Sequence, residues 1–191
     1  MDRFVADLHF GHKNNLAYDN RKFIDVEEHD EYIVKRWNET VSPFDHTYIL
    51  GDLSYHNVTK TIELLNRLEG DKTLILGNHD EKFMKNRDFK NCFREITYYK
   101  KLNFDDGRTL VLCHYCIPDF DNHYRNTGYH FHGHVHNTWE NNLMQYVKYL
   151  MESVYEKPCN MYNVGIMMPE MEFRPKTFTE IVDAYKESEN D

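Results

Sequence analysis

Twelve of the 191 residues are histidine, and most of them lie in short clusters that also contain Asp, Asn or Gly. Imidazole nitrogens favour ions such as Zn, Fe, Ni and Mn, while carboxylate and amide oxygens add harder ligands. The clusters are DLHFGH at 7–12, GD at 51–52, GNHD at 77–80, a histidine at 114, and GHVH at 133–136. Together they would suit two divalent transition metal ions with one carboxylate bridging them.

Each cluster follows a short apolar run of the kind that forms a strand. Strands are predicted at 3–6, 46–50, 73–76, 96–104, 109–113, 129–132 and 161–166. Ligand sites in open α/β sheets lie beyond the carboxyl ends of the strands. We therefore expect five strand ends to bring these polar side chains to one rim. Gly51, Gly77 and Gly133 would allow sharp turns or close backbone approach beside them.

Apolar residues at helical spacing predict helices at 28–41, 58–68 and 143–154. Asp106-Gly107 indicates a hairpin turn between two strands. Thr177 and Glu180 form a capping box at the start of a final helix. The order β-α-β-α-β followed by several strands predicts an α/β fold built as a sandwich of layers, rather than a pure Rossmann sheet.

Composition narrows the class of protein further. The net charge is −9, and no run of Lys or Arg is present, so stable nucleic-acid binding is not expected. No apolar run approaches the ~18 residues of a membrane span, and the first residues do not resemble a signal peptide. The four cysteines form no disulfide framework, so we expect a cytoplasmic protein with reduced thiols. The length favours one domain over 1–191, with a helical insertion at about 139–158.

The five motifs, in this order, resemble those of the calcineurin-like metallophosphoesterase superfamily. The resemblance spans residues 7 to 136. It implies two mixed β-sheets packed together and flanked by helices. It also implies two metal ions, with Mn as the first choice and Fe, Zn or Ni as alternatives.

The resemblance assigns a role to each motif residue. Asp7, His9 and His136 would bind the first metal, Asn78, His114 and His134 the second, and Asp52 both. His79 would face the substrate, and Asp80 would hold the His79 ring in one tautomer.

This assignment implies a phosphoesterase that hydrolyses phosphomonoesters or phosphodiesters. A metal-bound hydroxide would attack phosphorus, and His79 would assist the leaving group. His12 is a candidate for substrate binding, with a surface loop as the alternative. Arg21 is a candidate for clamping a phosphate oxygen, with a surface arginine as the alternative. The expected partner is a small phosphoester such as a nucleotide, and the sequence carries no pattern that sets an oligomeric state.

Two other functions compete with this interpretation. One is a nuclease of the same superfamily, and the other is a non-catalytic protein-binding scaffold. The presence of His79 and of all seven ligands argues against the scaffold, and a metal sensor or store would not explain His79 and Asp80. Of the remaining histidines, His130 and His132 are expected on the strand that leads to His134, where they would either pack or support the metal ligands. Surface or local hydrogen-bonding roles are expected for His29, His46, His56 and His123. The Cys113-x-x-Cys116 spacing is interpreted as a coincidence.

Overall fold

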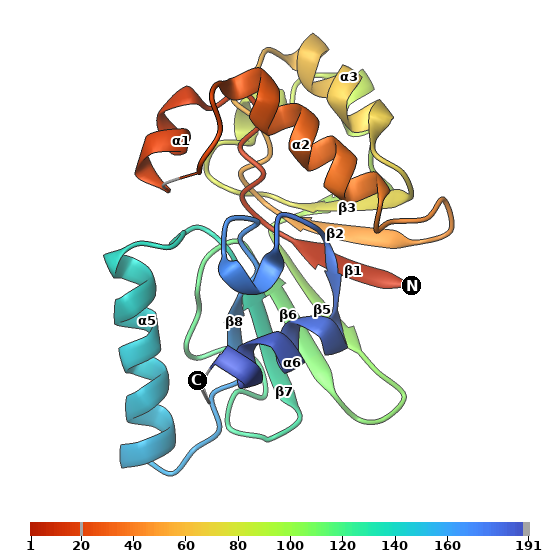
Figure 1. Ribbon diagram of the computed structural model, residues 1–191. Coiled ribbons are helices and arrows are strands. Elements are labelled where there is room, and N and C mark those ends of the chain that lie inside the picture. The colour runs from red at the N-terminus through yellow and green to blue at the C-terminus, as the bar shows by residue number, and fades with distance from the viewer. Residues whose placement is uncertain (20, 189–191) are drawn as a thin grey trace.

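Five strands form a mixed sheet in the order β4-β3-β2-β1-β9. The computed structural model describes residues 1–19 and 21–188 (Figure 1). Strands β1 (Asp2–Val5), β2 (His46–Leu50), β3 (Asp71–Ile75) and β4 (Glu95–Thr97) are parallel. The short β9 (Lys176–Thr177) pairs antiparallel with β1 at the edge.

A second sheet has the order β5-β6-β7-β8. Strand β5 (Tyr99–Asn103) runs antiparallel to β6 (Thr109–Cys113), and the predicted hairpin joins them. Gly107 has φ +86° in that turn, a conformation that glycine adopts without strain. Strands β7 (Gly128–His132) and β8 (Met161–Asn163) continue the sheet in parallel.

The two sheets pack on each other through apolar side chains. Phe4 of β1 and Phe131 of β7 are both fully buried, with ring centroids 5.1 Å apart in an edge-on contact. One hydrophobic cluster includes residues from both sheets. The α/β fold of two mixed sheets is therefore confirmed.

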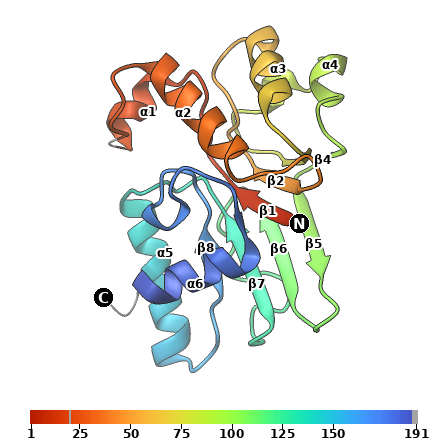
Figure 2. The same ribbon diagram turned by 45° about the vertical axis from the view of Figure 1, so that its right-hand side comes forward.

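Helices surround this pair of sheets (Figures 1 and 2). Helices α2 (Val26–Asn38) and α3 (Val58–Arg67) lie against the first sheet, and α5 (Trp139–Tyr149) and α6 (Phe178–Ser188) lie beside the second. Asp25 and Asn57 cap α2 and α3, and the predicted capping box opens α6. A π-helical turn, Leu150–Val154, continues α5, which confirms the predicted helix in the 139–158 segment. The shorter elements are α1 (Lys13–Tyr18), α4 (Arg87–Lys90) and the 3-10 turns Glu81–Phe83 and Pro169–Met171.

One expectation about the elements was wrong. The single strand predicted at 96–104 is two strands: β4 belongs to the first sheet and β5 to the second, with the exposed Tyr98 between them. The alternation of apolar residues is the same for a strand in either sheet, so it does not show where the chain passes from the first sheet to the second.

None of the helices in the described segments 1–19 and 21–188 is long and apolar enough to cross a membrane.

Candidate metal centre

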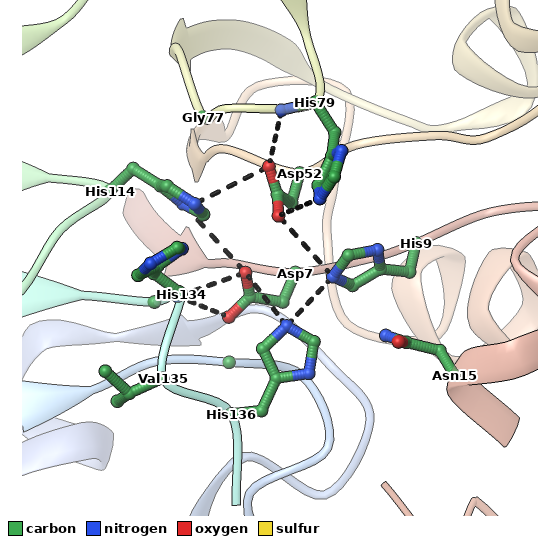
Figure 3. A network of polar contacts seen from close by, with 12 residues as sticks. Asp7, His9, Asn15, Asp52, Gly77, His79, His114, His134, Val135 and His136 are labelled. Atoms are coloured by element: carbon green, nitrogen blue, oxygen red, sulfur yellow. Dashed lines mark hydrogen bonds and ion pairs between the residues drawn. The ribbon is translucent and has the colours of Figure 1, made fainter. Parts of the chain in front are cut away.

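The polar clusters converge where strands of both sheets end (Figure 3). Strand β1 leads to Asp7 and His9, and β2 leads to Asp52. Strand β6 leads directly to His114, and β7 leads to His134 and His136. The expectation that separate strand ends meet at one rim is confirmed.

Four of these side chains form one potential metal site. The ligand atoms of Asp7, His9, Asp52 and His136 lie within 4.8 Å of one another. The Nε2 atoms of His9 and His136 are 3.0 Å apart, and His9 Nε2 lies 3.7 Å from Asp52 Oδ2. Three of the residues are buried and His136 is partly buried. This group could hold a metal ion.

A second group shares Asp52. The ligand atoms of Asp52, His114 and His134 also lie within 4.8 Å of one another. Asp52 Oδ1 lies 3.5 Å from His114 Nε2, so the two carboxylate oxygens face different groups. Asn78 Oδ1 lies 3.1 Å from the same nitrogen of His114. The structure thus brings together all seven predicted ligands.

Hydrogen bonds orient two of the imidazoles so that each could bind a metal ion. His136 Nδ1 lies 2.8 Å from Asp19 Oδ1, and His114 Nδ1 lies 2.8 Å from the carbonyl oxygen of Leu50. Both partners are acceptors, so each Nδ1 carries the proton and each Nε2 presents a lone pair to the site. Imidazoles that bind metals donate their other N–H in the same way.

Burial makes the charged forms of the side chains in this site unfavourable when no counter-charge is present. Burial raises the pKa of Asp7, although the neighbouring His136 and His114 oppose the rise. Burial, together with the charge of Arg21, lowers the pKa of His9 well below its usual value. A neutral His9 ring therefore faces buried carboxyl groups, and a cation at this place would offset the cost of removing those carboxylates from water.

Five of the predicted ligands have left-handed backbone conformations. The φ angles are 55° at Asp7, 50° at His9, 52° at Asp52, 70° at His134 and 49° at His136. Such a conformation costs on the order of 1–3 kcal/mol per non-glycine residue and persists only where surrounding contacts impose it. Strain of this kind gathers at functional sites, and no sequence motif indicated it.

Arg21 imposes part of this backbone geometry, so its predicted role as a phosphate clamp was wrong. Its side chain is buried, with only 4% of the residue exposed. The guanidinium donates to the carbonyl oxygens of Asp7 at 3.0 Å and Leu8 at 3.2 Å, and to Asp19 at 2.9 Å. With these donors engaged inside the protein, Arg21 holds the chain that carries the first two ligands.

Asp80 is a second backbone support, and its predicted contact with the His79 ring was wrong. The Asp80 carboxylate accepts hydrogen bonds from the backbone N–H groups of Asp52, Leu53 and Gly77, at 2.9–3.0 Å. Burial raises its pKa to about 6, even though these hydrogen bonds lower it. Asp80 therefore positions Asp52, because it binds the backbone on both sides of the Asp52 side chain.

His79 and His12 lie at the rim of the centre. His79 Nε2 is 3.9 Å from Asp52 Oδ2, and its side chain is 41% exposed. His12 stacks on Tyr55 with ring centroids 3.5 Å apart, and its Nδ1 lies 3.3 Å from His9 Nδ1. Burial and the charges of His79 and Arg21 lower the pKa of His12 to about 4. His12 thus lies beside the candidate metal centre, directly before α1.

A buried polar network behind the centre had no sequence motif. Asp30 accepts from Gly11 N at 3.1 Å, His29 Nδ1 at 3.0 Å and His56 Nε2 at 2.7 Å. His29 Nε2 contacts Arg21 at 2.9 Å, so the network reaches the ligand loop. The local hydrogen-bonding role expected for these two histidines is confirmed, but His29 is buried and not at the surface.

The other histidines agree with their expected roles. His130 and His132 are buried and bond to backbone groups. His46 contacts Thr73, and His123 bonds to the carbonyl of Phe120. The four cysteines are free thiols.

Asn163 was also missed by the sequence analysis. Its side chain donates to the carbonyl of His136 at 2.9 Å and accepts from Gly165 N at 2.9 Å. It therefore joins the last ligand to the chain that follows β8.

Comparisons with known proteins show relatives without an assigned activity. The chain is 37% identical over 134 residues to an uncharacterized protein of Methanocaldococcus jannaschii, which covers 69% of this chain and 67% of that protein. It is 42% identical over 88 residues to the Gene 66 protein of Mycobacterium phage L5, covering 44% of this chain and 42% of the phage protein. The Gene 66 protein of Mycobacterium phage D29 is 37% identical over 105 residues, covering 53% and 50%. The match therefore spans half or less of these phage proteins.

The fold occurs in a solved structure. The crystal structure of a protein of unknown function from Aquifex aeolicus superposes with a TM-score of 0.70 at 23% identity, covering 96% of this chain and 98% of that one. This likeness shows the fold alone. No family model matches the chain. The identity and coverage of the archaeal match show that the chain belongs to the same protein family as the uncharacterized protein of M. jannaschii.

Proposed function

We propose that the chain is a dinuclear metal-dependent phosphoesterase with the fold and ligand arrangement of the calcineurin-like metallophosphoesterases. The observation that carries the proposal is the position of Asp52. One oxygen of its carboxylate faces His9 and the other faces His114, and each oxygen belongs to a separate potential metal site. A carboxylate in this position can bridge two ions.

The side chains fit divalent transition metals. Asp7, His9 and His136 would hold one ion together with Asp52, and Asn78, His114 and His134 would hold the other. Nitrogen and oxygen ligands in this mixture suit Mn, Fe, Zn or Ni. The protonated Nδ1 atoms of His114 and His136 leave Nε2 free to ligate.

A pair of bound metals would neutralise the charge of the phosphate oxygens and favour ionisation of water near neutral pH. Side chains of the protein would supply the positioning and the proton donation. Asp52 Oδ1 accepts a hydrogen bond from the backbone N–H of His79 at 3.1 Å, so His79 lies beside both potential metal sites. The half-exposed His79 ring would carry a proton at Nε2 and donate it to the oxygen of the departing alcohol. Tyr55, with its ring centroid 4.8 Å from that of His79, limits the rotation of this ring.

The test combines metal content with turnover. Purified protein is stripped of metal, reloaded with Mn²⁺ and assayed with an aryl phosphomonoester and an aryl phosphodiester. We expect metal-dependent hydrolysis of one or both esters, and loss of both metals in Asp52→Ala. Asp119→Ala is the matched control, since it removes a carboxylate that is 93% exposed and lies outside both groups.

Two results would contradict the proposal. Retention of two metals by Asp52→Ala would show that its carboxylate does not bridge them. Two bound metals in the parent protein with no turnover of either ester would favour the non-catalytic scaffold.

A further inference from the structure

A cavity opens directly beside the proposed metal centre. Its volume is about 410 Å³, within the range of small-molecule sites. His134 and His136 line one part of it, and residues of α1 and of the start of α5 line the remainder. A phosphate held at the metal centre would therefore lie at one end of this cavity, so the rest of the substrate can occupy it.

Two large aromatic side chains border the cavity. Tyr18 ends α1 and is 74% exposed, and Trp139 begins α5 and is 68% exposed. Within the described part of the chain, neither ring stacks on another aromatic ring. Large apolar side chains this exposed mark binding surfaces when they gather at one place. A flat aromatic group can stack on such rings whatever its exact substituents.

The charges around the cavity limit what can bind. Among the described residues that line it, none is Lys or Arg. Its carboxylates are Asp19, which is already paired with Arg21 and His136, and Glu140, which accepts a hydrogen bond from Thr138. A second phosphate group in this cavity would therefore meet no cation from the chain. An uncharged group with N–H donors, such as an amino-substituted base, would be accepted.

We propose that this cavity binds the aromatic base of a nucleotide that carries a single phosphate, with the base stacked on Trp139 or Tyr18. The inference rests on the proposed phosphoesterase function, since that function places the phosphate at the metal centre. Under this proposal, Tyr18 and Trp139 determine substrate specificity, because they select phosphates that carry an aromatic base.

Tryptophan fluorescence tests the binding step without turnover. The chain has two tryptophans: Trp37 is fully buried, and Trp139 borders the cavity. Excitation at the red edge of tryptophan absorption avoids absorption by the base. We expect adenosine 5′-monophosphate to quench the emission and ribose 5-phosphate to leave it unchanged. Trp139→Phe should abolish the quenching. Equal responses to both phosphates, or no response to either, would overturn the proposal.

Kinetics test the same contact in catalysis. Trp139→Ala should lower kcat/KM for adenosine 5′-monophosphate by about 5- to 100-fold, the usual effect of losing a stacked aromatic, mostly through KM. The value for ribose 5-phosphate should not change. Tyr146→Ala is the matched control, because Tyr146 is 57% exposed on the same helix and does not line the cavity.

The two proposals fail in different ways. Hydrolysis of both phosphates at equal rates, unaffected by Trp139→Ala, would overturn the base site and leave the phosphoesterase standing. Quenching by the nucleotide with no metal-dependent hydrolysis of any ester would support the base site and contradict the phosphoesterase.

Discussion

Replacing the buried Arg21 by methionine tests how the strained ligand loop is held. The guanidinium donates to the carbonyl oxygens of Asp7 and Leu8, contacts His29, and pairs with Asp19. Both side chains of the Arg21–Asp19 pair are fully buried. Methionine keeps most of the side-chain volume but removes every one of these donors.

The magnitude follows from what the substitution leaves behind. Removing one partner of a buried ion pair costs about 3–5 kcal/mol, because the other charge stays buried. Each carbonyl left without a donor costs about 1–3 kcal/mol if it stays dry, although these costs are not additive. We therefore expect the free energy of unfolding to fall by about 3–5 kcal/mol or more. For a chain of this size, that corresponds to a fall in Tm of about 6–20 °C.

The assay is urea unfolding followed by circular dichroism, with a chelator present so that metal binding does not contribute. Arg67→Met is the matched control. Arg67 makes a two-pronged ion pair with Glu31 at 2.7 and 2.5 Å, but the two side chains are 42% and 61% exposed. An exposed pair contributes about 1 kcal/mol or less.

Equal destabilisation by the two substitutions would refute the reasoning. If Arg21→Met does not fold, Arg21→Lys is measured instead, since it keeps the charge without the fork of donors. Its loss of unfolding free energy should be larger than that of Arg67→Met and smaller than that expected for Arg21→Met. Because Asp19 also orients His136, we expect Arg21→Met to weaken metal binding by about 10- to 100-fold, measured by competition with a chromogenic chelator.

Three further predictions concern the rim, the metal groups and pH. His79→Ala should keep its metals and slow hydrolysis of an alkyl phosphate by about 10²- to 10⁴-fold, with a smaller loss on a nitrophenyl ester. An equal loss on both esters would argue against proton donation. Gly77→Ala should lower the metal content, since its added Cβ would lie against the Asp52 carboxylate and 2.6 Å from the Asp52 nitrogen; full metal content would contradict this packing. Burial opposes ionisation of Glu180, but hydrogen bonds outweigh it and lower its pKa from 4.5 to about 2. Its stabilisation is therefore complete above pH 4.5 and is lost as the pH falls toward 2, so Glu180→Gln should flatten the decline in unfolding free energy from pH 6 to pH 3.5, and Glu187→Gln should not.

Much of the fold could be predicted because its signals are local. The apolar run at 46–50 and the run at 109–113 became strands with the predicted bounds. The Asp106-Gly107 turn and the capping box of α6 also formed as expected. Each depends on residues close in sequence, whose periodicity or turn chemistry decides the local conformation.

The identity of the candidate ligands also came from the sequence. Histidine, Asp and Asn following strand-like runs indicated a rim of metal ligands, and all seven side chains meet there. Within each sheet, parallel strands deliver their carboxyl ends to one edge, and the packing of the two sheets brings the two edges together.

Only the tertiary structure decided how that rim is held. Arg21 and Asp80 were expected at the substrate or the His79 ring, yet both bind backbone groups beside the ligands. The same structure showed left-handed backbone at five ligands, the Asp30 network and the change of sheet at Tyr98. A charged side chain takes the partner that burial leaves beside it, and that partner can be distant in sequence. Residue type and spacing therefore determined which groups could do the chemistry, while packing decided which of them touch and which only support.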